Sequence, residues 1–210
     1  MTDQQHRFAL EFLTQLPLAD FNDVLDIGSG PGYQSEWFAQ QGKHVTAFDL
    51  VAPSVDVPFL QGDAEDLPFA SETFDAVWTH HTFEHLQNPL KCLAEAHRVL
   101  LPNGWLFFTV PQIDGVISNG HIVSYDMALV IYHLAMCGFD VRHGFFGKFR
   151  SHLRCAVRRV HHRDMESNIT RLRDQGRLPA SCDRVISNTG RFTRQSLVTK
   201  WLDGTTHTYQ

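Results

Sequence analysis

Short apolar runs alternate with longer segments of helical periodicity up to about residue 160. Buried parallel strands have continuous apolar runs, and the helices that join them carry one apolar face, so this alternation is typical of a parallel sheet covered by helices. The sequence therefore predicts a doubly wound α/β fold of the Rossmann-like kind, with a mostly parallel seven-stranded sheet that ends in an antiparallel hairpin. Strands are predicted at residues 24–27, 44–48, 57–60, 74–79, 105–110, 139–146 and 153–160, and helices at 5–16, 33–41, 88–100 and 125–136.

The connection between the second and third predicted strands is unusually short. Only about eight residues separate them, Pro53 among them, whereas a parallel crossover normally takes about a dozen residues or more. We therefore expect the helix of this crossover to be missing or reduced to a turn. Pro58 lacks an amide hydrogen, which predicts an edge position for the third strand.

The charges change sign along the chain. Residues 1–141 hold 4 basic and 18 acidic side chains, whereas residues 142–210 hold 14 basic and 5 acidic ones, which agrees with the net charge of −5. A basic segment indicates either a surface for an anionic partner or a segment that packs on the acidic part of its own chain, and both interpretations stay open. We expect residues 1–160 to form one domain and residues 161–210 a basic extension packed on or near it.

Nothing in the sequence predicts secretion or a membrane span. No apolar run approaches the ~18 residues that a membrane helix needs, and the polar N-terminus lacks the basic-then-apolar order of a signal peptide. The 4 cysteines are far apart and form no C-x-x-C pair, so we expect reduced, packed thiols. These features predict a cytoplasmic protein without a membrane partner, and they do not indicate an oligomeric state.

Glycines directly follow the first predicted strand, in the segment VLDIGSGPG at residues 24–32. Glycine allows a tight turn and the close approach of a ligand to the main chain. A dinucleotide pyrophosphate favours a third glycine where this chain has Tyr33, and Pro31 removes an amide that a phosphate could use. S-adenosylmethionine (SAM) has no phosphate and bears two cationic groups, so an acid such as Asp26 beside the loop favours SAM over a dinucleotide.

Several motifs, in order along the chain, resemble those of the class I SAM-dependent methyltransferases, in particular the type 11 group that includes the ubiquinone and menaquinone biosynthesis methyltransferases. Each motif alone is weak evidence for the family, whereas the occurrence of all of them in the same order is strong evidence. The resemblance covers roughly residues 20–160 and rests on VLDIGSGPG (24–32), Asp49, GDAEDLPF (62–69), FDAV (74–77), FEHL (83–86), VLLPNG (99–104) and the segment from His121 to Phe139.

The resemblance implies SAM as the cofactor and methyl transfer to an oxygen, nitrogen or carbon nucleophile. It implies that Asp49 accepts hydrogen bonds from both ribose hydroxyls and that Asp63 and Ala64 face the adenine. Asp49 also stands about 20 residues after the glycine loop, where an acid meets a ribose in doubly wound folds. The cofactor-binding residues expected on this basis are Asp26, Gly28, Ser29, Gly30, Gly32, Asp49, Leu50, Asp63, Ala64 and His80.

The run His81 to His85 (HTFEH) also fits the H-x-x-E-H pattern of an inverted zinc peptidase. That chemistry needs both histidines on one helical face and a third ligand downstream. Here the run leaves a buried strand and meets Asn88 and Pro89 within three residues, which argues against a long helix. We therefore expect no metal.

Ligands of open α/β sheets bind beyond the carboxyl ends of the strands. The acceptor-side candidates at these ends are His80, His81, Glu84, His85, Gln112, His121 and Tyr125. Methyl transfer is an in-line displacement that depends mainly on alignment, and a base is needed only where the nucleophile must lose a proton. His121 and His81 are the candidates for that base, and shaping of the substrate is the alternative role for each.

The expected acceptor is a small molecule, and the arginine-rich segment favours an anionic one. Two alternatives stay open. One is an RNA methyltransferase that docks nucleic acid on its basic C-terminal segment, although the sequence contains no known nucleic-acid-binding module. The other is a SAM-binding protein without turnover. On the seventh predicted strand, alternation predicts that Arg154 and Arg158 face solvent.

Overall fold

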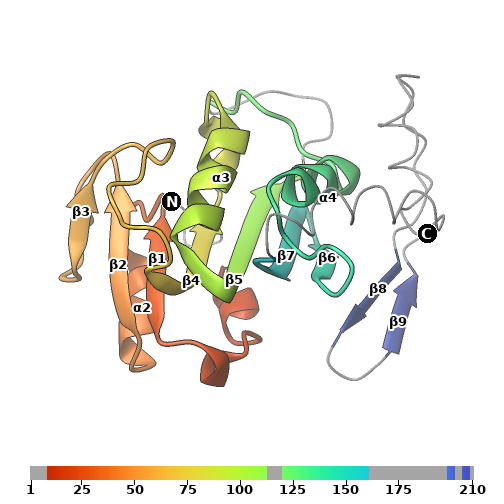
Figure 1. The fold of residues 1–210 in the computed structure, drawn as a ribbon, viewed down its shortest axis with the longest axis horizontal. Helices are drawn as coiled ribbons and strands as arrows, with labels where there is room; N and C mark the ends of the chain where they lie inside the picture. The colour runs from red at the N-terminus through yellow and green to blue at the C-terminus, as the bar shows by residue number, and fades with distance from the viewer. Residues whose placement is uncertain (1–8, 113–119, 161–197, 202–204, 209–210) are drawn as a thin grey trace.

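The computed structural model describes residues 9–112, 120–160, 198–201 and 205–208. A seven-stranded sheet with the order β3-β2-β1-β4-β5-β7-β6 forms its centre (Figure 1). β1 pairs with β2 on one side and with β4 on the other. The chain therefore builds the sheet outward from β1 first in one direction and then in the other. The predicted doubly wound α/β fold is therefore confirmed.

β1 to β5 run parallel to one another, whereas β7 pairs antiparallel with both β5 and β6, so the sheet is mostly parallel and ends in an antiparallel hairpin, as predicted. β3 lies at the sheet edge. A separate antiparallel pair, β8 (Val198–Trp201) and β9 (Thr205–Thr208), lies near the C-terminus. The bounds of the sheet strands are β1 Asp23–Ile27, β2 His44–Asp49, β3 Phe59–Gln61, β4 Phe74–His80, β5 Leu100–Pro111, β6 Phe145–Phe149 and β7 His152–Arg158.

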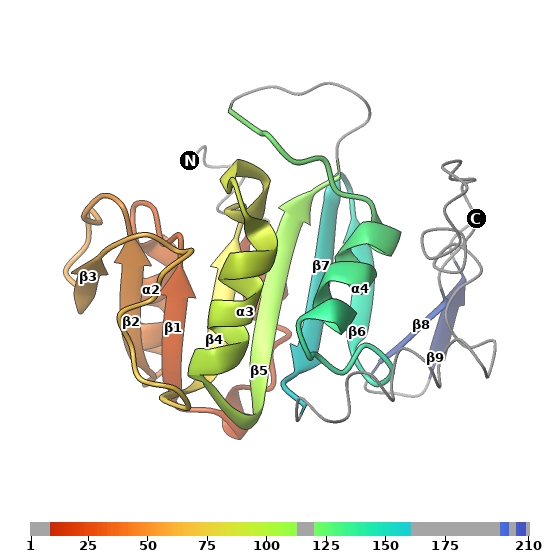
Figure 2. The ribbon, with the colours of Figure 1, turned by 45° about the horizontal axis from the view of Figure 1, so that its top comes forward.

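Helices cover both faces of the sheet. α2 (Tyr33–Gln40) lies on one face, and α3 (Pro89–Val99) and α4 (Met127–Met136) lie on the other (Figure 2). The side chain of Asp126 caps α4 by accepting a hydrogen bond from the Leu129 amide at 2.7 Å. Within the described part of the chain, no helix has both the length and the apolar character that crossing a membrane would require. Single 3-10 turns, η1 (Leu18–Asp20) and η2 (Phe83–His85), complete the set.

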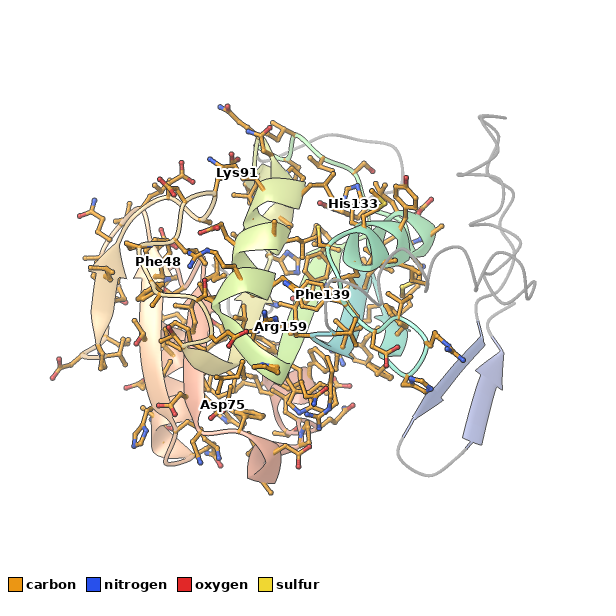
Figure 3. All side chains as sticks on the ribbon, viewed as in Figure 1. Phe48, Asp75, Lys91, His133, Phe139 and Arg159 are labelled. Atoms are coloured by element: carbon orange, nitrogen blue, oxygen red, sulfur yellow. The ribbon has the colours of Figure 1, made fainter. Side chains whose placement is uncertain are left out.

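Alternate residues of the strands fill two cores, one on each face of the sheet. Leu25 and Ile27 of β1 belong to the core under α3 and α4, whereas Val24 belongs to the core under α2. Successive strand side chains point to opposite faces, so a continuous apolar run serves both cores. The larger core extends from Phe48 on β2 to Phe139 after α4 (Figure 3).

The link between β2 and β3 contains no helix, as predicted. Residues 50–58 form bends and irregular backbone. Ser54 anchors the link, because its amide and its hydroxyl both donate to the carbonyl of Pro31, at 3.0 and 3.1 Å. Without a covering helix, Leu50 and Val51 stay 65% and 70% exposed.

The strand predicted at residues 139–146 begins later in the structure, at Phe145. Asp140 explains the difference, because its Oδ1 accepts hydrogen bonds from the amides of Arg142 and His143 at 3.0 and 3.3 Å. An aspartate that bonds the backbone two residues on forms a turn. Apolar content alone did not reveal this turn.

β5 begins at Leu100, earlier than the predicted residue 105. Residues 102–104, which precede the predicted strand, form an irregularity within β5. Asn103 adopts a left-handed φ of 64°, and the pairing with β4 shifts register between Phe74 and Ala76. Phe74 pairs with Leu100 and Ala76 with Trp105, so β5 accommodates three extra residues here without ending.

The prediction that Arg154 on β7 faces solvent is wrong. The residue is only 5% exposed, and its guanidinium lies 4.2 Å from the ring centre of Phe149 and 5.6 Å from that of Phe12. Cation–π attraction allows the charge to sit against these rings. Arg158 is partly exposed and forms an ion pair with Asp20 at 2.8 Å. The predicted extension at 161–210 lies outside the described residues, apart from β8 and β9.

Truncating Phe12 is expected to destabilise the domain. Residues 9–13 are helical, and the fully buried Phe12 ring lies 5.8 Å from that of Trp78 and 6.1 Å from that of Phe145. Phe12→Ala should lower the free energy of unfolding by about 3–5 kcal/mol, because it leaves a cavity. Urea denaturation measures the change. Gln15→Ala at an exposed position is the control, with a change below about 0.5 kcal/mol.

Candidate functional site

A cavity of about 420 Å³ opens beyond the carboxyl ends of β1, β2 and β4. This is the switch point of the sheet, where open α/β folds bind their ligands, and the volume is typical of small-molecule sites. The cavity brings together many of the residues predicted from the sequence. Those that line it are Gly28, Gly30, Asp49, Leu50, Asp63, Ala64, His80, His81 and His121.

The glycine loop turns where a side chain would not fit. Gly28 has a φ of +72°, and a Cβ built on it would collide with the hydroxyl of Thr82. That hydroxyl donates to the carbonyl of Ile27 at 3.2 Å, so the loop packs directly on the turn after β4. The close approach explains why the sequence requires glycine at this position.

Asp49 ties the glycine loop to the end of β2. Its Oδ2 accepts a hydrogen bond from the Gly30 amide at 2.8 Å, and its Oδ1 accepts one from the Val51 amide at 3.1 Å. Each carboxylate oxygen has a further lone pair, and the residue lines the cavity. Asp49 can therefore accept hydrogen bonds from a vicinal diol while it holds the loop.

The segment after β3 forms the next wall of the cavity. The Gly62 amide donates to the carbonyl of Asp49 at 3.0 Å, which places Asp63 and Ala64 beside it. Asp63 accepts a hydrogen bond from the Glu65 amide at 2.9 Å. Asp63 and Ala64 therefore both border the cavity at this wall.

Three residues of the predicted cofactor set, Asp26, Ser29 and Gly32, are not among the residues that line the cavity. Asp26 is 1% exposed and accepts a hydrogen bond from the Ser35 hydroxyl at 2.5 Å, so it joins β1 to α2. Burial raises the pKa of Asp26 to about 7, and the hydrogen bond from Ser35 offsets part of that rise. Ser29 is 1% exposed, and Gly32 starts α2 with a φ of +89°.

Histidines form the opposite end of the cavity. His81, at the end of β4, has a left-handed φ of 55° and donates its amide to the Thr109 carbonyl at 3.0 Å. Its ring has a neighbour on each side, since Nδ1 makes a 3.1 Å ion-pair contact with Glu84 Oε1 and Nε2 lies within hydrogen-bond distance of His152 Nδ1, at 2.8 Å. Burial lowers the pKa of His152 to about 4, with contributions from nearby cationic groups, so this ring is neutral at physiological pH. The His80 ring contacts Thr109 Oγ1 at 2.5 Å.

Glu84 lies at the centre of this end and is fully buried. Its carbonyl accepts hydrogen bonds from the amides of Ile122 and Val123 at 2.7 and 3.1 Å, which brings His121 next to its carboxylate. The distance from His121 Nε2 to Glu84 Oε1 is 4.0 Å. Burial lowers the pKa of His121 below its ordinary value. Of the other acceptor-side candidates, Gln112 and Tyr125 do not line the cavity, whereas Glu84 and His85 do.

Sequence reasoning missed part of the cavity wall. The lining residues that it did not assign to the site are Pro31, Phe48, Gly62, Thr82 and Leu86. Gly62 belongs to a motif of the resemblance and could have been included on that ground. Thr82 carries no sequence signal, because its role depends on the packing of its hydroxyl against a loop far away in the chain.

The fold, the glycine loop over the cavity and the carboxylate at the end of β2 together define a nucleoside-binding α/β domain. Comparisons with known proteins agree. Residues 25–108 match the model of the family described as "Methyltransferase domain". Over these residues the chain is similar to the class I SAM-dependent methyltransferases, whose methyl donor is SAM.

Two curated relatives illustrate the extent of the similarity. Malonyl-[acyl-carrier protein] O-methyltransferase of Enterobacter lignolyticus is 33% identical over 120 residues, which cover 53% of this chain and 48% of that protein. Demethylmenaquinone methyltransferase of Renibacterium salmoninarum is 38% identical over 91 residues, which cover 40% and 38%. The chain thus spans about half or less of the length of the curated relatives that it matches.

A solved structure supports the fold. The crystal structure of Burkholderia thailandensis 1,6-didemethyltoxoflavin-N1-methyltransferase, with bound 1,6-didemethyltoxoflavin and S-adenosylhomocysteine, superposes with a TM-score of 0.62 at 22% identity. The match covers 75% of this chain and 79% of that chain. At this level of identity the likeness shows a shared fold, and the reaction has to be argued from the site.

Asp26→Asn is expected to change how stability depends on pH. The pKa of Asp26 is about 7 in the folded chain and about 3.8 when exposed. Between these values the folded state keeps a proton that the unfolded state loses, so wild-type stability falls as pH rises from about 4 to 7. The neutral asparagine does not titrate, so the variant does not lose this stability. The difference in unfolding free energy between the variant and the wild type should therefore rise by on the order of 3 kcal/mol over this pH range.

Urea denaturation at several pH values from 4 to 8 measures this difference. Asp23→Asn, at an exposed carboxylate that pairs with His44 on the surface, is the matched control. A difference between Asp26→Asn and wild type that stays constant with pH would contradict the raised pKa.

Proposed function

We propose that this chain transfers a methyl group from SAM to an oxygen, nitrogen or carbon nucleophile of a small, anionic molecule. The observation that carries the proposal is the arrangement of the cavity. A diol-binding carboxylate and a glycine loop form one end, and a cluster of histidines with a buried glutamate forms the other. A donor and an acceptor bound at the two ends would meet inside one cavity.

In this proposal the donor lies on the glycine loop. Asp49 accepts hydrogen bonds from the ribose hydroxyls, and Asp63 and Ala64 border the adenine. Leu50, which is exposed beside Asp49, offers an apolar surface to the same ring. Asp26, Ser29 and Gly32 act mainly by holding the loop, and Gly28, Gly30 and His80 approach the methionine part of SAM.

Methyl transfer itself needs little from the protein beyond alignment. A lone pair of the acceptor forms a bond to the methyl carbon while the carbon–sulfur bond breaks. The electron pair of the broken bond neutralises the sulfonium, and S-adenosylhomocysteine leaves. Where the acceptor atom carries a proton, His121 or His81 is placed to receive it at the acceptor end, and the contacts that the His81 ring already makes with Glu84 and His152 favour His121.

The described arginines favour a small acceptor over RNA. Arg158 and Arg159 pair with Asp20 and Glu72, at 2.8 and 2.9 Å. Side chains from the acidic part of the chain thus occupy arginines that a nucleic acid would need, which supports the self-packing interpretation of the basic segment. An RNA methyltransferase would instead show RNA binding that weakens steeply with salt. A SAM-binding protein without turnover would show donor binding and no methylated product with any acceptor.

We also propose that residues 161–210 form an extension of the domain at 1–160 and that the protein works in the cytoplasm. Cys92, Cys137 and Cys155 are free thiols in the described part of the chain, which fits a reducing compartment. Burial raises the pKa of each of these thiols, so they are packing residues and not nucleophiles.

Asp49→Ala is expected to weaken SAM binding by about 1–3 kcal/mol, roughly 5- to 150-fold in Kd, because it orphans the ribose hydrogen bonds. Isothermal titration with SAM and with S-adenosylhomocysteine measures the effect. Asp56→Ala, an exposed carboxylate in the same link between β2 and β3, is the control and should bind as wild type does.

Unchanged affinity in a folded Asp49→Ala chain would contradict the ribose assignment. Failure of the wild-type chain to bind either compound would overturn the proposed function as a whole.

A further inference from the structure

The Glu84 carboxylate is buried at the acceptor end of the cavity without full compensation. The residue has no exposed surface, and neither of its oxygens has a hydrogen bond within the described part of the chain. Its nearest basic group is His81 Nδ1, at 3.1 Å from Oε1. Taking a carboxylate out of water costs several kcal/mol unless a cation or hydrogen bonds replace the water. The carboxylate therefore lacks compensation that a bound cation would supply.

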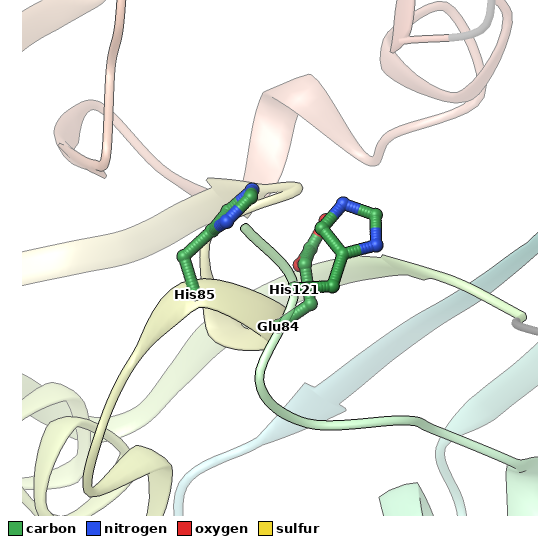
Figure 4. A group of neighbouring side chains, drawn as sticks. All are labelled: Glu84, His85 and His121. Atoms are coloured by element: carbon green, nitrogen blue, oxygen red, sulfur yellow. The ribbon is translucent and has the colours of Figure 1, made fainter. Parts of the chain in front are cut away.

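Two imidazole rings stand next to this carboxylate. His85 follows Glu84 in η2, and His121 is held beside it by the backbone hydrogen bonds of Ile122 and Val123 to the Glu84 carbonyl. One possible ligand atom from each of Glu84, His85 and His121 lies within 4.8 Å of the other two. Figure 4 shows the three side chains gathered on the same side of η2.

Each ring has a nitrogen with no hydrogen-bond partner among the described residues. His85 Nδ1 lies 3.1 Å from the Gly120 carbonyl, which can only accept, so Nδ1 carries the proton and Nε2 keeps its lone pair. Such a second hydrogen bond is the usual device that orients a metal-binding histidine. Nδ1 of His121 is buried and has no hydrogen-bond partner among the described residues.

We propose that Glu84, His85 and His121 bind a divalent first-row transition-metal ion such as Zn²⁺. Two imidazoles and one carboxylate suit these ions, whereas Mg²⁺ and Ca²⁺ prefer oxygen ligands throughout. Ligand atoms around such an ion lie roughly 3–3.5 Å apart. The three possible ligand atoms lie within 4.8 Å of one another, so a bound ion would draw them closer together, and the exposed His85 side chain has the most freedom to move.

This assignment revises the expectation that the chain holds no metal. The H-x-x-E-H chemistry would need both histidines on one long helix, which the sequence argued against and the described structure does not contain there. Instead Glu84 and His85 share one 3-10 turn, and His121 supplies the third ligand from a distant segment. His81 takes part only through its contact with Glu84.

The role of the ion rests on the proposed function. Three protein ligands leave at least one coordination position open toward the cavity that Glu84, His85 and His121 line. An acceptor oxygen in that position would lose its proton to solvent more readily, because the ion stabilises the resulting anion. Its lone pair would then take the methyl group. In this arrangement His121 holds the ion and does not receive the proton, and the acceptor is an oxygen nucleophile.

The test is metal binding by tag-free chain freed of metal with a chelator. Titration with Co²⁺ should give visible ligand-field bands of one bound ion, and calorimetry with Zn²⁺ should give one matching site. His121→Ala and His85→Ala should each weaken Zn²⁺ binding at least about 10- to 100-fold and abolish the Co²⁺ bands. Glu84→Gln keeps the shape of a buried side chain, and circular dichroism checks that each variant folds.

His44→Ala and His143→Ala, which remove exposed histidines that pair with surface aspartates, are the matched controls and should bind Zn²⁺ as wild type does. Absence of a one-ion site in the wild-type chain overturns the proposal. Binding that survives His121→Ala and His85→Ala overturns it too, because the ion then sits elsewhere.

Metal binding and donor binding are measured separately, so the two proposals fail in different ways. Loss of the metal site in His121→Ala with unchanged affinity for S-adenosylhomocysteine supports the assignment of this cluster. A wild-type chain that binds Zn²⁺ at this cluster but neither SAM nor S-adenosylhomocysteine would contradict the proposed function and leave the metal site standing.

Discussion

The donor side of the cavity depends on hydrogen bonds between the glycine loop and the end of β2. The Gly28 amide donates to the Phe48 carbonyl at 2.8 Å, and the Gly30 amide donates to the Asp49 carboxylate at the same distance. These bonds extend the parallel pairing of β1 and β2 beyond the strands. They hold the loop in its left-handed turns and fix the position of the Asp49 carboxylate at the same time. The pairing of β1 with β2 therefore also determines the geometry of the proposed cofactor site.

Buried polar groups accumulate at this edge of the sheet and are rare in the two cores. Asp26, His80, Glu84 and His152 are all nearly inaccessible to solvent and lie at or near the ends of the central strands. Each costs desolvation energy that an apolar residue would avoid. His81 adds a left-handed backbone conformation that is unfavourable for a residue with a side chain. Such costs concentrate at functional sites, where chemistry and not stability determines the residue.

The fold was predictable because its information is local. Apolar runs, glycines after a strand and helix starts such as Asn88 followed by Pro89 indicate elements within a few residues, and the short link after β2 predicted the missing helix correctly. The errors arose where a side chain acts on a distant partner or on its own backbone. Asp140 delays β6 through a local turn, and Arg154 is buried because Phe12 and Phe149 enclose it from other elements.

By itself the sequence determined the sheet, the glycine loop and the placement of Asp49, because each follows from periodicity or from order along one chain segment. Only the tertiary structure decided what surrounds them. It turned Asp26 away from the cavity toward Ser35, and it placed His121 beside Glu84. Those relations depend on how segments far apart in sequence pack together, and a linear pattern contains no record of such distances.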